Sequence, residues 1–239
     1  FKVADRMAAL EEKFIFTKVN GAKDEGAKEF RTTYNVIGFP TVLILTPDGS
    51  EVDRVVGFGG SGDETQDAEA FMTTMDAFAA GEGTLMALQK ELETDPENLD
   101  TILAMARKRV KRYETADARS YFEKALALDP DDNAGFHEEA NFYVALAGVR
   151  DGNVDALSAF LDKTSNEEYL MTGSSALVRY YRKAKDFGKV AELYDRMLKA
   201  APEDTGLMNQ YAWMVYQEKL ADQYPRAIEL AAKAVELNP

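Results

Sequence analysis

Four prolines, each at the end of a helical pattern, recur along most of this 239-residue chain. Pro96 and Pro130 are 34 residues apart, the next step to Pro202 is 72 residues, and the step to Pro239 is 37. The interval of 72 is close to two repeats with a small insertion. Paired helices that recur at such a period bury their apolar faces only against neighbouring pairs, so several pairs must stack. The spacing predicts an all-α solenoid over residues 99–239.

Four repeats are expected, beginning near residues 99, 133, 171 and 205, and the second is degenerate because no proline closes it. Residues that fit helix packing positions are Ala106, Ala118, Phe122 and Ala125 in the first repeat, Ala140, Tyr143 and Ala156 in the second, Tyr194 in the third, and Ala212, Ala227 and Ala234 in the fourth. This recurrence resembles the tetratricopeptide-repeat family over residues 99–239. The resemblance implies a groove that holds a partner protein or peptide.

Residues 1–82 have a different pattern, in which strands and helices alternate. Helical spacing predicts helices over 2–12, 24–34 and 63–78. Strands are predicted at Lys13–Asn20, Thr41–Thr46 and Glu51–Phe58, which are rich in β-branched and aromatic residues. The Pro47-Asp48-Gly49 turn joins the last two strands into an antiparallel hairpin. A linker helix over 83–98 then leads into the repeats.

The segment Tyr34-Asn-Val-Ile-Gly-Phe-Pro-Thr41, followed by an apolar strand, a Pro-Asp-Gly turn and Val-Val-Gly, resembles the C-terminal half of a thioredoxin-like domain. The resemblance implies that Pro40 is a cis proline and that Phe39, Pro40 and Thr41 contact substrate. The family's Cys-x-x-Cys is not in this chain, which contains no cysteine. The expected fold class is therefore an incomplete α/β thioredoxin-like domain over 1–82 followed by a tetratricopeptide solenoid.

The thioredoxin fold also implies a strand between the predicted strands at 13–20 and 41–46. Without that strand, both would expose unpaired backbone edges. We therefore expect either roughly 30 to 40 further residues upstream, enough for a strand and a helix, or another segment that fills the gap.

One residue in each repeat directly follows the position where the two helices cross, and the tetratricopeptide resemblance implies that it faces the groove. This row is Arg107, Asn141, Arg179 and Trp213, with His137, Ser175, Arg182, Asn209 and Tyr216 at neighbouring groove positions. Arginine can bind a carboxylate with two hydrogen bonds, and Trp and Tyr are frequent interface anchors. The alternative is that the side chains in the groove are simply solvated. Outside the groove positions, we expect Lys108, Lys111 and Arg112 of the basic run 107–112 to lie on a solvated helix face.

The composition and the remaining motifs exclude several classes of function. The net charge of −14 argues against nucleic acid and anionic membranes as partners, and no apolar run reaches the length of a membrane span. Gly57–Gly62 matches G-x-G-x-x-G, but no strand ending in an acidic residue follows, so a flexible turn is the better interpretation. The acidic loops do not match a calcium-binding loop, and His137 is the single histidine. We expect no metal, no cofactor and no catalytic residue in this chain.

Three functions remain open. The first, which we favour, is a protein–protein interaction module whose repeats bind a partner beside the thioredoxin-like domain. The second is a thiol–disulfide oxidoreductase whose Cys-x-x-Cys lies upstream of Phe1, with the repeats recruiting substrate. The third is a subunit of a larger assembly, because the last helix has no polar capping helix after it. A periplasmic or secreted bacterial location is favoured over a cytoplasmic one.

Overall fold

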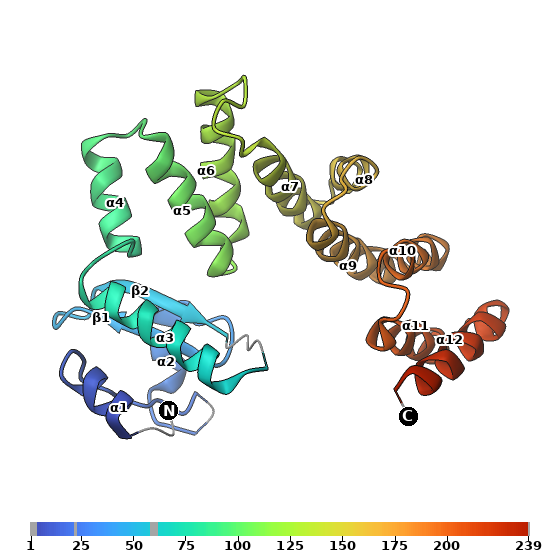
Figure 1. Ribbon diagram of the computed structural model, residues 1–239, viewed down its shortest axis with the longest axis horizontal. Coiled ribbons are helices and arrows are strands. Elements are labelled where there is room, and N and C mark those ends of the chain that lie inside the picture. The colour runs from blue at the N-terminus through green and yellow to red at the C-terminus, as the bar shows by residue number, and fades with distance from the viewer. Residues whose placement is uncertain (1–3, 22, 58–61, 239) are drawn as a thin grey trace. The chain divides into compact units, whose positions relative to one another are not determined.

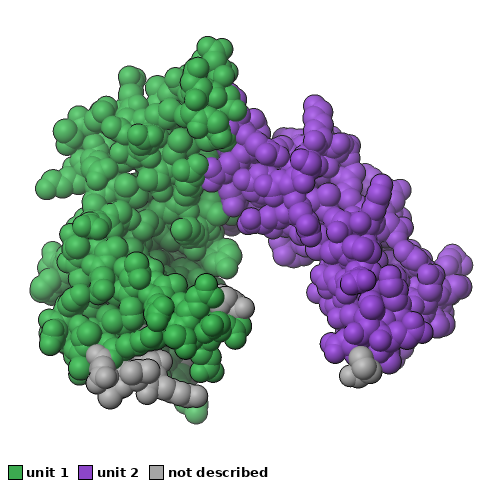
Figure 2. Space-filling view, in the orientation of Figure 1, with its two compact units in different colours: residues 1–136 green, residues 137–239 purple. Residues whose placement is uncertain are grey.

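The chain divides into two compact units, residues 1–136 (unit 1) and 137–239 (unit 2), which Figure 2 shows in different colours. The computed structural model describes residues 4–21, 23–57 and 62–238. Most of the glycine-rich segment 57–62 lies outside these residues. No helix in the described part of the chain is long and apolar enough to cross a membrane.

Unit 1 begins with a small α/β part. Its elements are α1 (Ala4–Glu11), α2 (Ala27–Thr33), β1 (Thr41–Leu45), β2 (Glu51–Val56) and α3 (Glu64–Ala79). β1 and β2 pair antiparallel, which confirms the predicted hairpin. Gly49 in the connecting turn has a φ of 87°, a conformation that glycine adopts without steric cost. α3 runs along the hairpin (Figure 1) and buries Phe71 and Met75 against Ile44.

The predicted strand Lys13–Asn20 is wrong, because the segment has no regular secondary structure. Its Ile15 side chain is 100% exposed. In the described residues, the sheet consists of β1 and β2 alone. A strand is stabilised by pairing with a neighbour rather than by its own sequence, and this segment has no such neighbour in the sheet.

The rest of unit 1 is helical. α4 (Leu85–Thr94) lies between the hairpin and a helix pair formed by α5 (Leu99–Lys111) and α6 (Thr115–Leu128). The Asn98 side chain accepts a hydrogen bond from the backbone N–H of Thr101 and so begins α5. Ala106 and Phe122 are fully buried between α5 and α6, as the first repeat predicts.

Unit 2 contains three further helix pairs. Its elements are α7 (His137–Gly148), η1 (Val149–Asp151), α8 (Asp155–Leu161), α9 (Glu167–Ala184), α10 (Phe187–Ala200), α11 (Thr205–Gln217), η2 (Ala221–Gln223) and α12 (Tyr224–Leu237). The pairs are α7 with α8, α9 with α10, and α11 with α12. Asp186 and Asp204 cap α10 and α11 by accepting backbone N–H groups of the first turn, which explains acidic residues in these loops. The step of 37 residues in the last repeat is three longer than the first step of 34, and the three-residue η2 lies between its two helices.

The core of unit 2 differs from the prediction in the degenerate repeat. Ala156, which we assigned to a packing position, is exposed. The short α8 instead buries Leu157 and Leu161. Phe142 of α7 packs in the same core, where it lies against Phe160 and Tyr169. A helix of only seven residues thus contributes two leucines in place of the predicted alanine.

Candidate functional site

Six of the predicted groove residues lie on two helices of unit 2, and five of them are described together first. Arg179 and Arg182 are on α9, and Asn209, Trp213 and Tyr216 are on α11. Residues three or four positions apart share one face of a helix, so each set projects from a single face. We call these five residues the α9/α11 surface.

Two aromatic rings on α11 contact each other in solvent. The ring centroids of Trp213 and Tyr216 are 5.6 Å apart, with an angle of 34° between the planes. The two side chains are nevertheless 61% and 67% exposed. Exposed pairs of large aromatic residues are typical of surfaces that bind another protein.

An ion pair connects the two helices of this surface. Arg182 Nη2 lies 3.3 Å from Glu218 Oε1, and Glu218 is the residue that ends α11. Because Glu218 follows Tyr216 by two residues, the pair brings a guanidinium to the end of α11 that carries the aromatic rings. An exposed pair of this kind contributes only about 0 to 1 kcal/mol to stability, so its effect here is mainly to position Arg182.

The other predicted groove residues are not all in the same unit. His137 is half-buried and Asn141 is exposed, both on α7, which packs against α9. Ser175 on α9 is half-buried, and its hydroxyl lies 3.8 Å from Met197 Sδ. Arg107 is exposed on α5 and belongs to unit 1. A single row that includes both Arg107 of unit 1 and the residues of unit 2 therefore stays a prediction.

Of the three residues predicted to contact substrate, Phe39 and Pro40 lie in the loop before β1, and Thr41 is the first residue of that strand. The peptide bond between Phe39 and Pro40 is cis. The Phe39 ring is exposed, with the Arg31 guanidinium carbon 6.0 Å from its centroid. Thr41 Oγ1 donates a hydrogen bond of 2.8 Å to the carbonyl of Gly38.

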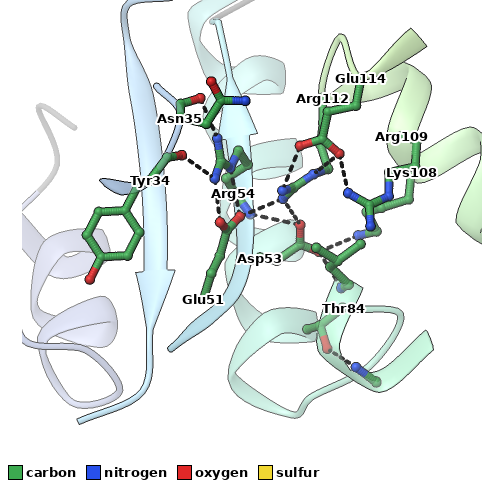
Figure 3. Close-up of polar contacts among 12 residues, drawn as sticks. Tyr34, Asn35, Glu51, Asp53, Arg54, Thr84, Lys108, Arg109, Arg112 and Glu114 are labelled. Carbon is green, nitrogen blue, oxygen red and sulfur yellow. Dashed lines mark hydrogen bonds and ion pairs between the residues drawn. The ribbon is translucent and has the colours of Figure 1, made fainter. Parts of the chain in front are cut away.

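A charged cluster that the sequence analysis missed lies inside unit 1 (Figure 3). It consists of Glu51, Asp53 and Arg54 on β2, Lys108, Arg109 and Arg112 at the end of α5, and Glu114 just before α6. We call these residues the buried ion network. Arg112 is 3% exposed, and the Lys108 side chain, which pairs with the completely buried Asp53, is 17% exposed. The prediction of solvated side chains at Lys108 and Arg112 is therefore wrong. Their charges are neutralised by β2 instead.

Arg112 is at the centre of the buried ion network. Its Nη1 lies 2.7 Å from Glu51 Oε1 and 3.2 Å from Asp53 Oδ1. Its Nε and Nη2 donate to the two carboxylate oxygens of Glu114 at 3.0 and 2.9 Å, the bidentate geometry that a guanidinium favours. One side chain thus joins strand β2 to the turn between α5 and α6.

Asp53 and Arg54 extend the network to other elements. Asp53 pairs with Lys108 and accepts a hydrogen bond from the backbone N–H of Leu85 at the start of α4, where a negative charge favours a helix. Arg54 donates to the carbonyls of Tyr34 and Asn35. The network therefore links four separate segments of unit 1, and we interpret it as structural rather than catalytic.

The network also changes the ionisation of two carboxyl groups. Burial of Glu51 opposes its ionisation, but hydrogen bonds and charges from Arg54 and Arg112 outweigh burial and lower its pKa below the usual 4.5. Burial likewise opposes ionisation of Glu114, and Arg112 and Arg109 outweigh it, so the pKa of Glu114 is also lowered. Both groups favour folding when ionised.

We expect unit 1 to lose stability in acid through these two groups. A lowered pKa in the folded state gives stability that is present above the unfolded value of about 4.5 and is lost as pH falls through the folded pKa. Urea unfolding measured between about pH 7 and about pH 3 tests this sign. The double variant Glu51→Gln, Glu114→Gln should be less stable at neutral pH and should lose less stability in acid. An identical pH dependence in both proteins would contradict the prediction.

The pairs of stacked helices define a tetratricopeptide-like helical solenoid. Two solved structures share this fold, "Crystal structure of MamA" and "Crystal structure of MamA protein", each with a TM-score of 0.50. Their sequences are 18% and 19% identical to this one; each match covers 71% of this chain, and 92% and 86% of the MamA chains. No protein-family model and no curated protein matches this sequence. The likeness supports the fold, and it gives no support to the thioredoxin-like interpretation of residues 1–82.

Proposed function

We propose that this chain is a protein–protein interaction module and that the α9/α11 surface binds a peptide segment of its partner. The observations that carry the proposal are the exposed ring pair of Trp213 and Tyr216 on α11 and the ion pair by which Arg182 of α9 contacts Glu218 at the end of the same helix. Aromatic rings bury a large apolar area on binding, and arginine binds carboxylates with directional hydrogen bonds. A segment with an apolar side chain next to an acidic one fits this chemistry best.

We also propose roles for residues 1–82 and 83–98. Residues 1–82 would form part of a thioredoxin-like domain that provides a second contact through Phe39, Pro40 and Thr41. Residues 83–98 would connect it to the repeats over 99–239. The antiparallel β1–β2 hairpin with α3 packed on it is compatible with this assignment. We also propose a periplasmic or secreted location, because a thioredoxin-like domain joined to tetratricopeptide repeats resembles bacterial proteins that are often exported.

The redox alternative depends on cysteines, and this chain has none. Its test is tandem mass spectrometry of the native polypeptide, which reads any sequence that precedes Phe1. A Cys-x-x-Cys there would make a thiol–disulfide oxidoreductase the better proposal, because its thiolate is the reacting group. A preceding segment without cysteines would exclude the redox alternative and leave protein binding as the proposed function.

Truncation of one ring of the surface should weaken peptide binding strongly. We expect a random peptide library panned against the full chain to be enriched in segments with an acidic residue beside an apolar one. For an enriched peptide, Trp213→Ala should raise the dissociation constant at least about 30-fold, the effect of losing an interface hot spot. Fluorescence anisotropy of the labelled peptide measures this change.

The matched control is a pair of tyrosine variants with similar exposure. Tyr216 is 67% exposed on the α9/α11 surface, and Tyr113 is 65% exposed in unit 1. Tyr216→Ala should weaken the peptide, whereas Tyr113→Ala should leave its affinity unchanged. Equal effects of the two changes, or a library that yields no binding peptide, would overturn the proposal. Added salt should weaken the complex if Arg182 contributes.

A further inference from the structure

The middle of helix α9 is open to solvent along one narrow stripe. From Gly173 to Tyr181, every residue except Arg179 is buried or half-buried. Residues three or four positions apart share one face of a helix, and the open face continues at this spacing toward both ends. We call the set the α9 stripe, which consists of Glu168, Thr172, Ser175, Arg179 and Arg182. Its last two residues also belong to the α9/α11 surface.

The two ends of the α9 stripe carry opposite charges. Glu168 lies at the N-terminal end, Arg179 and Arg182 lie at the C-terminal end, and only the neutral hydroxyl side chains of the stripe lie between them. Arg182 is paired with Glu218. Within the part of the chain that the structure describes, neither Glu168 nor Arg179 forms an ion pair. A ligand that lies along the stripe therefore meets an unpaired carboxylate at one end and an unpaired guanidinium at the other.

The helix dipole alone does not distinguish the carboxylate at the N-terminal end of the stripe. Glu167 and Glu168 both lie in the first turn of α9, where the dipole favours any negative charge. Glu168, however, acts on a neighbouring helix. Burial is the main cause that raises the pKa of Tyr143 on α7, and the charges of Glu168 and Glu139 raise it further, whereas Glu167 is not among these charges. The Glu168 carboxylate is therefore the one directed toward α7.

Two helices contribute to the acidic end of the stripe. α7 packs against α9, and the rings of Tyr143 and Tyr169 lie 6.4 Å apart with an angle of 74° between their planes. The carboxylates of Glu139 on α7 and Glu168 on α9 both act on the Tyr143 hydroxyl. A lysine or arginine side chain is attracted by both carboxylates and can donate a hydrogen bond to the phenol oxygen. The acidic end therefore has the chemistry to bind a basic side chain.

We propose that the partner's segment carries a basic residue as well as an acidic one, and that it lies along the α9 stripe with the basic residue at Glu168 and the acidic residue at Arg179. This inference rests on the proposed peptide binding by the α9/α11 surface. The charge order fixes the direction of the segment, because the reversed order would bring like charges together. The two stripe residues are 11 positions apart, about 16 Å along a helix, and an extended segment covers that distance in about five residues.

The random peptide library panned against the full chain tests the charge order. Among the peptides whose binding is weakened by Trp213→Ala, we expect a lysine or arginine about five residues from the acidic residue. For one such peptide, labelled with a fluorophore, Glu168→Lys should raise the dissociation constant about 5- to 10-fold, because it replaces an attraction by a repulsion. Exchange of the peptide's basic residue for glutamate should restore binding to that variant. Fluorescence anisotropy measures both changes.

Glu167→Lys is the matched control. It makes the same change of charge in the same exposed turn of α9 but outside the stripe, and it should change the dissociation constant less than about 2-fold in about 0.15 M salt. Equal effects of the two variants, no rescue by the charge exchange, or Trp213-dependent peptides without a basic residue would overturn this inference and leave the proposed function standing. A library that yields no binding peptide would overturn both.

Discussion

Arg112→Ala is expected to destabilise unit 1 by about 3 to 5 kcal/mol, because it removes a buried guanidinium that contacts three carboxylates, one of them completely buried. Arg112 contacts Glu51, Asp53 and Glu114, and Asp53 is completely buried. Urea unfolding followed by circular dichroism measures the loss.

The control is an arginine with an exposed partner. Arg119 and Glu123 form a pair four residues apart on α6, and both side chains are more than a third exposed. Arg119→Ala should cost less than about 0.5 kcal/mol. Arg112→Lys should fall between the two variants, since lysine keeps the charge but cannot form the bidentate contact with Glu114. A cost for Arg112→Ala as small as that for Arg119→Ala would show that the network does not hold unit 1 together.

Hydrogen exchange should locate the same loss. Amides of β2, α4 and α5 should exchange faster in Arg112→Ala, because the network joins these elements. If the packing of α5 against α6 held unit 1 together without the network, the β2 amides of Arg112→Ala would stay as protected as in the wild type. That result would contradict the prediction.

The sequence predicted the helices well because helical periodicity is a local signal. Ala106 and Phe122 were assigned from their places in one repeat, and both are fully buried. The burial of each side chain depends on residues within the same helix pair, and the spacing of the helix pairs can be read from the sequence. The tetratricopeptide resemblance implied that Trp213 and Tyr216 face the groove, and both side chains are exposed. Their ring contact and the Arg182–Glu218 pair follow only from three-dimensional geometry.

Pairings between distant residues were not visible in the sequence. Arg112 and Glu51 are 61 residues apart, so the basic run 107–112 had the local pattern of a solvated helix face. The acidic residues on β2 alternate with apolar ones, and that pattern equally fits a strand with one face in water. The predicted strand Lys13–Asn20 failed for a related reason, because a β-rich segment becomes a strand only where another strand is available to pair with it.

Phe142→Ala should have a similarly large effect in unit 2. The Phe142 ring stacks on Tyr169 with a centroid distance of 4.4 Å and an angle of 19°, and it lies 5.5 Å from Phe160. Removing a buried ring costs about 3 to 5 kcal/mol, since the lost contacts leave a cavity. Trp213→Ala is the control in the same urea titration, because it removes a larger ring that is mostly exposed and should change stability by less than about 0.5 kcal/mol.

The location of the damage tests why the degenerate repeat folds at all. α8 has seven residues, whereas α6 in the first repeat has fourteen, and so short a helix is not stable by itself. Leu157, Leu161 and Phe160 attach it to the aromatic cluster around Phe142. In a solenoid each repeat is stabilised by its neighbours, so Phe142→Ala should release α8 first, and α8 amides should exchange fastest. Equal loss of protection in α8 and α12 would mean that unit 2 unfolds as one cooperative body and that the aromatic cluster has no local role.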